Sequence, residues 1–217
     1  MSNSDNHSDN NNWLSNIKEI PPLLDRQKIK IKDLEKSAVL VIDVQNHTSL
    51  ENVGFWKGAF KKDAPYFFDR IETVTDNIKK ILDASRANKK TERIFTVIES
   101  LTKSGRDCSL DYKLSFNAKT KEPIMVPKGS WGAKVVDKIA PTEDGEEIVL
   151  PKSSCSVFVS TNIHFVLTNL NVKLLIMVGQ LTNQCVESAV RDAADLGYLV
   201  TVVEDACAAN SLSLIHI

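Results

Sequence analysis

Short apolar runs alternate with segments of helical periodicity along most of the chain. The runs are rich in Val, Ile and Leu, end in polar or turn residues, and lie at 37–44, 93–100, 146–152, 172–179 and 198–205. This pattern is typical of strands buried on both faces. The segments between them have apolar residues at helical spacing, at 69–87, 130–139, 161–170 and 182–196. The alternation predicts an α/β fold, a three-layer α/β/α sandwich with a mainly parallel, doubly wound sheet.

The length and the apolar content fit one domain. With 217 residues, 42% of them hydrophobic, the chain can bury one sizeable core, and we place this domain at 37–211. Residues 1–12 are polar and Asn-rich and are expected to form a disordered tail. The segment 13–36, which contains Pro21 and Pro22, is expected to form an arm draped over a domain or a neighbouring subunit.

The charge and hydropathy of the chain exclude several classes of function. A net charge of -1, from 27 basic and 28 acidic residues, creates no broad field for nucleic acid or for an anionic membrane. No apolar run approaches the roughly 18 residues that span a bilayer, and the N-terminus lacks the order of a signal peptide. We therefore expect a cytoplasmic protein whose partner is a small molecule. The four cysteines lack metal-ligand spacing and are expected to be free thiols.

Three reactive side chains follow predicted strands at their carboxyl ends, the edge of a parallel sheet where ligands bind. Asp43 closes the first run, Lys152 closes the third, and Cys185 lies just after the fourth, in the first turn of the next helix. Taken singly, an acidic turn residue, a solvated lysine and a buried cysteine are ordinary structural features. Together they predict a reactive site at one rim of the sheet.

The chemistry of these side chains is complementary. A thiolate attacks a carbonyl carbon, while Asp43 takes the thiol proton and passes it to a leaving amine, and Lys152 keeps that carboxylate ionised and positioned. With Thr182 or Asn183 as the N-cap, the helix dipole is expected to lower the pKa of Cys185. Backbone N–H groups of the turn GQLTNQC would bind the developing oxyanion. The constellation predicts amide hydrolysis through an acyl-enzyme.

Several ordered motifs in this chain resemble those of the isochorismatase-like cysteine hydrolases. They are VLVIDVQN, then KGSW followed by IVLPK, then VGQLTNQCVESAVRDAADLGY, and finally VVEDACA, and together they span about residues 37 to 210. The resemblance implies that Asp43, Lys152 and Cys185 form the Asp-Lys-Cys triad of the family. It also implies a cis peptide bond between Gln180 and Leu181, and an oxyanion hole made by the backbone amides of Leu181 and Cys185. By analogy with the family, we expect a homo-oligomer.

The end of the chain departs from the family pattern. Where the family continues with a helix and a last strand, this chain ends in NSLSLIHI. The codons at the end of a sequencing-library adapter translate to LSLIHI. We therefore expect residues 212–217 to be a sequencing-adapter artefact and the fold to lack its last helix and strand.

Within the family, the presence of Cys185 favours C–N hydrolysis, because isochorismatases proper lack this nucleophile. The spacing from KGSWGAKVVDKIAP to EEIVLPK is most similar to ureidoacrylate amidohydrolases, with N-carbamoylsarcosine amidohydrolase second. Nicotinamidases bind a metal through an Asp-x-His pair and a further His, whereas His47 is the only histidine between Asp43 and Lys152. We therefore expect no metal and no cofactor. The alternatives are a nicotinamidase-like or other small-amide hydrolase, and a non-catalytic member that binds a metabolite or a partner.

Four residues are candidate substrate contacts. By analogy with the family, Trp131 and Phe158 line the pocket, although apolar rings near strand ends are core residues about as often. Glu99, which closes the second strand, and Arg106 are candidates for reading a ureido and a carboxylate group, although solvated loop charges are more common. Cys155 and Cys207 lie beside strand ends and match no catalytic position, so we assign them to packing. His164 is assigned to the surface or the core.

Overall fold

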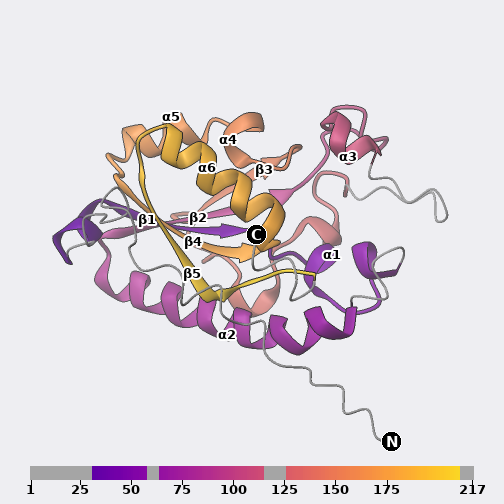
Figure 1. Cartoon of the computed structure of the whole chain (residues 1–217), viewed down its shortest axis with the longest axis horizontal. Helices are drawn as coiled ribbons and strands as arrows, with labels where there is room; N and C mark the ends of the chain where they lie inside the picture. Colours follow the sequence, from indigo (N-terminus) through magenta and orange to yellow (C-terminus); the bar gives the residue numbers. More distant parts are fainter. Residues whose placement is uncertain (1–30, 58–63, 115–125, 211–217) are drawn as a thin grey trace, which may run out of the picture. The chain divides into compact units, whose positions relative to one another are not determined.

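The structure is a computed structural model that describes residues 31–57, 64–114 and 126–210 (Figure 1). The expected tail 1–12 and the expected artefact 212–217 lie outside the described residues, as does most of the expected arm. The last part of that arm, Ile31–Lys36, is a 3-10 helix that leads directly into the first strand. None of the described helices is long and apolar enough to cross a membrane.

The described part of the chain contains a five-stranded sheet in which every neighbouring pair is parallel. Its order is β3-β2-β1-β4-β5, so the first strand lies in the middle and the chain winds outward in both directions. The predicted α/β class with a parallel, doubly wound sheet is confirmed. Each strand lies within a few residues of its predicted run: β1 Ser37–Ile42, β2 Thr91–Ile98, β3 Ile148–Lys152, β4 Leu174–Gln180 and β5 Leu199–Ala208.

Helices cover both faces of the sheet (Figure 1). The long helix α2, Ala64–Asn88, packs on one face, where Phe67, Ile78 and Leu82 meet Val41 and Phe95. The other face is covered by α4 (Val157–Ser160), α5 (Ile163–Asn169) and α6 (Glu187–Asp195), whose apolar residues pack against Leu40, Ile42 and Met177. Alternate residues of each strand serve the two faces, which explains why the strands read as continuous apolar runs.

The predicted helix 130–139 is wrong. This segment contains two 3-10 turns, Trp131–Ala133 and Asp137–Ile139, separated by extended backbone. The extended part bonds to the chain that follows β1: the Asn46 amide donates to the Lys134 carbonyl and the Val136 amide donates to the Val44 carbonyl. These long-range bonds replace the local ones that a helix would need. As a result, the segment is held beside the carboxyl end of β1 and beside the short helix α1, Asn46–Ser49.

Gly179 allows the carboxyl ends of β1 and β4 to approach closely. Its φ angle is 118°, and a Cβ atom there would overlap the backbone of Ile42 on the neighbouring strand. Only glycine combines this backbone conformation with this proximity. Asp43, directly after Ile42, also has a positive φ of 56°, a region that Asp tolerates better than most residues. The chain therefore turns sharply at Asp43, the candidate acid, directly after the end of β1.

A buried carboxylate fastens α2 to the sheet on the side away from this rim. The Glu147 side chain is 1% exposed and pairs with Arg86 of α2 and Arg93 of β2, each at 2.8 Å from Oε1. The Thr142 amide also donates to Glu147 Oε2. Burial acts to raise the pKa of Glu147, but the hydrogen bonds from Arg86 and Thr142 outweigh it and lower the pKa.

Removing this carboxylate should destabilise the fold. Glu147→Ala leaves two partly buried guanidinium groups without their partner, and we expect a loss of about 3 kcal/mol in the free energy of unfolding. Urea denaturation measures this loss, with Glu146→Ala as the control because the Glu146 side chain is exposed. Since the folded pKa is lowered, the contribution of Glu147 should be present at neutral pH and disappear as the pH falls below about 4. Equal stability of the two variants at neutral pH would contradict this role.

Candidate active site

The three predicted reactive residues lie together at the carboxyl edge of the sheet. Asp43 directly follows β1, Lys152 is the last residue of β3, and Cys185 lies in the turn after β4. All three are buried, with exposed fractions of 1%, 1% and 4%. The Lys152 side chain lies on the face covered by α5 and α6, because Ile148 and Leu150 of the same strand pack into that cluster. Because β2 lies between β3 and β1 in the sheet, the Lys152 side chain extends past β2 to reach Asp43.

The Lys152 ammonium is the centre of this cluster. Its Nζ lies 2.9 Å from Asp43 Oδ2 and 3.3 Å from Cys185 Sγ. The same ammonium donates to the carbonyl oxygens of Ser154 and Cys155, each at 2.9 Å. Backbone carbonyls and the Asp43 carboxylate therefore replace the water that a lysine ammonium would otherwise bind.

The Asp43 carboxylate is fixed on its second oxygen as well. Thr96 of β2 donates from Oγ1 to Asp43 Oδ1 at 2.8 Å. The backbone carbonyl of Asp43 accepts hydrogen bonds from Thr48 Oγ1 at 2.7 Å and from Gln180 Nε2 at 2.8 Å. The Gln180 side chain also donates to Ser49 Oγ. The loop after β1 and the end of β4 thus hold the acid in one orientation.

Among the described residues, the Cys185 thiol also contacts the side chains of Tyr112 and Cys155. The Tyr112 hydroxyl lies 3.4 Å from Sγ, and the Cys155 Sγ lies 3.9 Å away. Cys155 also accepts a hydrogen bond from Ser188 Oγ at 3.5 Å. The predicted packing role of Cys155 is incomplete, because its thiol faces the candidate nucleophile.

The pKa values describe a resting site with a protonated thiol. The hydrogen bond with Cys155 and burial raise the pKa of Cys185, while the charge of Lys152 acts in the opposite direction. Burial raises the pKa of Asp43, although Lys152 opposes this. Burial acts to lower the pKa of Lys152, but the charges of Asp43 and Cys185 outweigh it and raise the pKa. The predicted lowering of the Cys185 pKa by a helix dipole is therefore wrong, because the thiol is buried beside a second thiol.

The turn that carries Cys185 differs from the predicted helix start. Thr182–Val186 forms a single π-helical turn whose N-cap is Leu181, and no side chain caps it, so neither Thr182 nor Asn183 has the predicted role. The regular helix α6 begins only at Glu187. The Gln180–Leu181 peptide bond is cis, the form that the family resemblance implies. The amides of Leu181 and Cys185 stay the candidate oxyanion hole.

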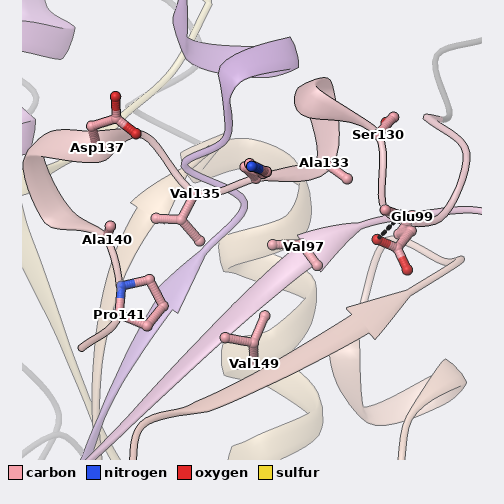
Figure 2. Close-up of a pocket in the computed structure, with 11 residues that line it drawn as sticks. Val97, Glu99, Ser130, Ala133, Val135, Asp137, Ala140, Pro141 and Val149 are labelled. Carbon is pink, nitrogen blue, oxygen red and sulfur yellow. Dashed lines mark hydrogen bonds between the residues drawn. The ribbon is translucent and has the colours of Figure 1, made fainter. Parts of the chain in front are cut away.

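The Glu99 side chain makes no described contact with Asp43, Lys152 or Cys185, although its backbone amide donates to the Lys152 carbonyl at 3.0 Å. The Glu99 carboxylate accepts a hydrogen bond from the Gly129 amide at 3.2 Å and lines a cavity of about 340 Å³ (Figure 2). Val97 and Val149 line the same cavity from the sheet face that packs on α2. Neither Asp43, Lys152 nor Cys185 is among its described lining residues.

The other candidate contacts occupy varied positions. Trp131 is 57% exposed, and its carbonyl accepts a hydrogen bond from Asn46 Nδ2. Phe158 is half-buried on α4, packs against the cluster that includes Cys185, and lies near the Tyr198 ring. Arg106 is exposed in its loop. Of the two predicted aromatic contacts, Phe158 is therefore the one that packs against the cluster containing Cys185.

Tyr112 and Thr96 also belong to the site, although no motif in the sequence predicts a role for either residue. Tyr112 belongs to the short helix α3, Leu110–Leu114, which follows a loop and carries no motif. Thr96 lies within a strand of apolar residues, and only its register opposite Ile42 shows that it reaches Asp43. Among the described residues, no group of three or more His, Cys, Asp and Glu side chains is placed to hold a metal ion.

The fold and this edge site define a parallel α/β domain whose reactive residues follow the carboxyl ends of its strands. Residues 37–216 match the isochorismatase domain, so the chain belongs to the isochorismatase family. This match confirms the resemblance found in the sequence. The protein is therefore an enzyme of the hydrolase class. Ureidoacrylate amidohydrolase RutB of Rhizobium rhizogenes is 32% identical to it over 188 residues, covering 83% of this chain and 73% of the relative.

Solved structures support the same fold. An isochorismatase family protein from Desulfovibrio vulgaris superposes with a TM-score of 0.67 at 25% identity, covering 83% of this chain and 86% of that chain. N-carbamoylsarcosine amidase from Thermoplasma acidophilum superposes with a TM-score of 0.60 at 21% identity, covering 80% of this chain and 84% of that one.

The paired thiols give a test of the electrostatics described above. The hydrogen bond with Cys185, with smaller help from Ser188 and Lys152, lowers the pKa of Cys155 to about 6 despite partial burial. Alkylation of Cys155 by iodoacetamide should therefore be half-maximal near pH 6, well below the roughly 8.5 of an ordinary thiol. Peptide mass spectrometry of quenched samples measures the rate at each pH.

Cys185→Ala supplies the matched comparison for this experiment. It removes the thiol that bonds to Cys155, so the half-maximal pH should rise towards the ordinary value. Cys108, whose pKa burial raises, is an internal reference in the same digest. A half-maximum near pH 8.5 in the unmodified protein would show that the two sulfur atoms do not interact as described.

Proposed function

We propose that this protein is a cysteine-dependent amidohydrolase that cleaves a C–N bond of a small ureido or carbamoyl substrate through a thioester acyl-enzyme. The observation that carries this proposal is the position of the Lys152 ammonium, in contact with both the Asp43 carboxylate and the Cys185 thiol. Its membership of the isochorismatase family and its 32% identity to a ureidoacrylate amidohydrolase support the same reaction class.

The reaction begins with a proton transfer. Because the resting thiol is protonated, a base must remove its proton, and Asp43 is the carboxylate of this cluster. The thiolate that forms is stabilised by the Lys152 ammonium 3.3 Å away. The raised pKa of Asp43 lets it hold the proton until the leaving group needs it.

The thiolate then attacks the carbonyl carbon of the substrate. A bond forms between Cys185 Sγ and that carbon, and the carbonyl oxygen gains negative charge, which the amides of Leu181 and Cys185 would bind. When the C–N bond breaks, Asp43 returns its proton to the leaving nitrogen, so the amine departs neutral and a carbamoyl thioester remains on Cys185.

Water completes the cycle. Asp43, again ionised, takes a proton from a water molecule, whose oxygen attacks the thioester carbon. The carbon–sulfur bond breaks, Asp43 returns this proton to the Cys185 sulfur, and carbamic acid leaves and decomposes to ammonia and carbon dioxide. Both half-reactions use the same three side chains.

We further propose that the protein acts in the cytoplasm as a homo-oligomer, as expected from the sequence.

A substrate screen with ammonia release as the readout tests the reaction class. We expect ureido and carbamoyl compounds to be hydrolysed with a kcat/KM at least about tenfold above that of simple amides such as nicotinamide. The rates should be unchanged after exhaustive treatment with EDTA, since His47 is the only histidine between Asp43 and Lys152. Faster turnover of nicotinamide, lost with EDTA and restored by zinc or iron, would favour the nicotinamidase-like alternative.

Substitutions in the cluster test the mechanism. Cys185→Ala, Asp43→Asn and Lys152→Met should each lower kcat by about 10³-fold or more, and the losses should be far from additive because the residues act as one unit. Cys207→Ala is the control, since no described hydrogen bond joins this buried thiol to Asp43, Lys152 or Cys185, and its sulfur donates only weakly to the Met177 carbonyl. Retention of full activity by Cys185→Ala would refute the thioester mechanism, whereas loss of activity in Cys207→Ala alone would point to a different nucleophile.

A further inference from the structure

Among the described residues outside the predicted triad, Tyr112 contacts two triad members through a single side-chain oxygen. Its hydroxyl lies 3.4 Å from Cys185 Sγ and 3.2 Å from Lys152 Nζ. The Lys152 ammonium also lies 5.7 Å from the centre of the Tyr112 ring. The side chain is 6% exposed and packs against Ile98 and Cys108, so these apolar neighbours hold the ring in place.

The hydrogen-bond donors and acceptors around the Tyr112 hydroxyl determine which group its proton can bond to. Lys152 has no acceptor, so it donates to the Tyr112 oxygen. The single proton of Tyr112 then has two acceptors in reach, the Ser154 carbonyl at 3.1 Å and Cys185 Sγ at 3.4 Å. A neutral thiol is a weak acceptor and a thiolate is a strong one. The proton can therefore face Ser154 in the resting enzyme and turn to sulfur when the thiolate forms.

We infer that Tyr112 is a further catalytic residue, whose hydroxyl donates a hydrogen bond to the Cys185 thiolate while it accepts one from the Lys152 ammonium. This inference rests on the proposed thioester mechanism. The hydroxyl is suited to the role because it stays protonated: burial, and then the charges of Cys185 and Asp43, raise the pKa of Tyr112 far above its usual range. The hydrogen bond from Tyr112 in turn acts to lower the pKa of Cys185.

The role of Tyr112 differs from that of Lys152. The ammonium must stay close to Asp43 and bonds to two carbonyls, so it is shared among several acceptors. Tyr112 can give its whole donor to sulfur without leaving a charge unpaired. When the thioester forms and the sulfur loses its charge, the proton can return to the Ser154 carbonyl, so the hydrogen bond favours the thiolate over both neutral states of the sulfur.

Tyr112→Phe tests this inference, because it removes the oxygen and keeps the ring among its apolar neighbours. The titratable groups that act on Cys185 are Cys155, Lys152, Asp43 and Tyr112 itself. The measurement is therefore made in a Cys155→Ala background, where Cys185 is the reactive thiol of the pair. The rate of Cys185 alkylation by iodoacetamide is followed against pH by peptide mass spectrometry, and kcat/KM is measured by ammonia release.

We expect Tyr112→Phe to raise the half-maximal pH of Cys185 alkylation by about one unit and to lower kcat/KM at neutral pH about tenfold. Tyr198→Phe is the matched control, because its hydroxyl bonds to His164 and not to the cluster, and it should leave both quantities unchanged. Replacing Tyr112 by 3-fluorotyrosine, a stronger donor of nearly the same shape, should lower the half-maximal pH.

The outcomes separate this inference from the proposed function. An unchanged alkylation profile in Tyr112→Phe, or a shift of the same sign in both Tyr112 variants, would reduce Tyr112 to a packing residue. If no tested compound releases ammonia, the proposed function fails, while the alkylation profile still decides whether Tyr112 stabilises the thiolate. A profile shifted as predicted, with kcat/KM unchanged, would overturn the catalytic role and leave only an electrostatic one.

Discussion

The arrangement of this site depends on one buried cation. Moving a lysine ammonium out of water costs several kcal/mol unless hydrogen bonds and an opposite charge replace its hydration. Lys152 is 1% exposed and receives both, from the Asp43 carboxylate and from the carbonyls of Ser154 and Cys155. The ends of β1, β3 and β4 and the turn after β3 must therefore be correctly placed before the buried ammonium is stable. The same requirement places a carboxylate, an ammonium and a thiol within reach of one another.

The buried ammonium also determines where protons reside. Burial alone would keep Asp43 and Cys185 neutral, and the pKa values of both groups are raised. Lys152 opposes both shifts, so Asp43 and Cys185 can together carry one negative charge, either on the carboxylate or on the Cys185 sulfur. Transfer of the thiol proton to Asp43 moves that charge by a short distance and creates no new one. A low-polarity site thus suits a reaction in which an acid stores a proton between two steps.

Much of this arrangement could be predicted from the sequence, because it follows from the strands. The runs ending at Asp43 and Lys152 fixed two strand ends, and parallel strands bring such ends to one edge. The expected helix 130–139 failed because its bonds are made with the chain after β1, which no local pattern reveals. Tyr112 was missed because α3 reaches the site from a loop. The pKa of Cys185 was predicted in the wrong direction because the helix-terminus rule takes no account of burial or of the neighbouring Cys155.

The central claim is that Cys185 becomes covalently acylated during turnover. Rapid acid quenching of the protein with the ureido or carbamoyl compound that it hydrolyses fastest, followed by peptide mass spectrometry, tests this claim directly. The account predicts that the peptide containing Cys185 gains the mass of a carbamoyl group, and that the adduct disappears when the substrate is exhausted. A carbamoyl group found on Cys155, or no adduct on Cys185 in samples of the unmodified protein quenched during turnover, would contradict it.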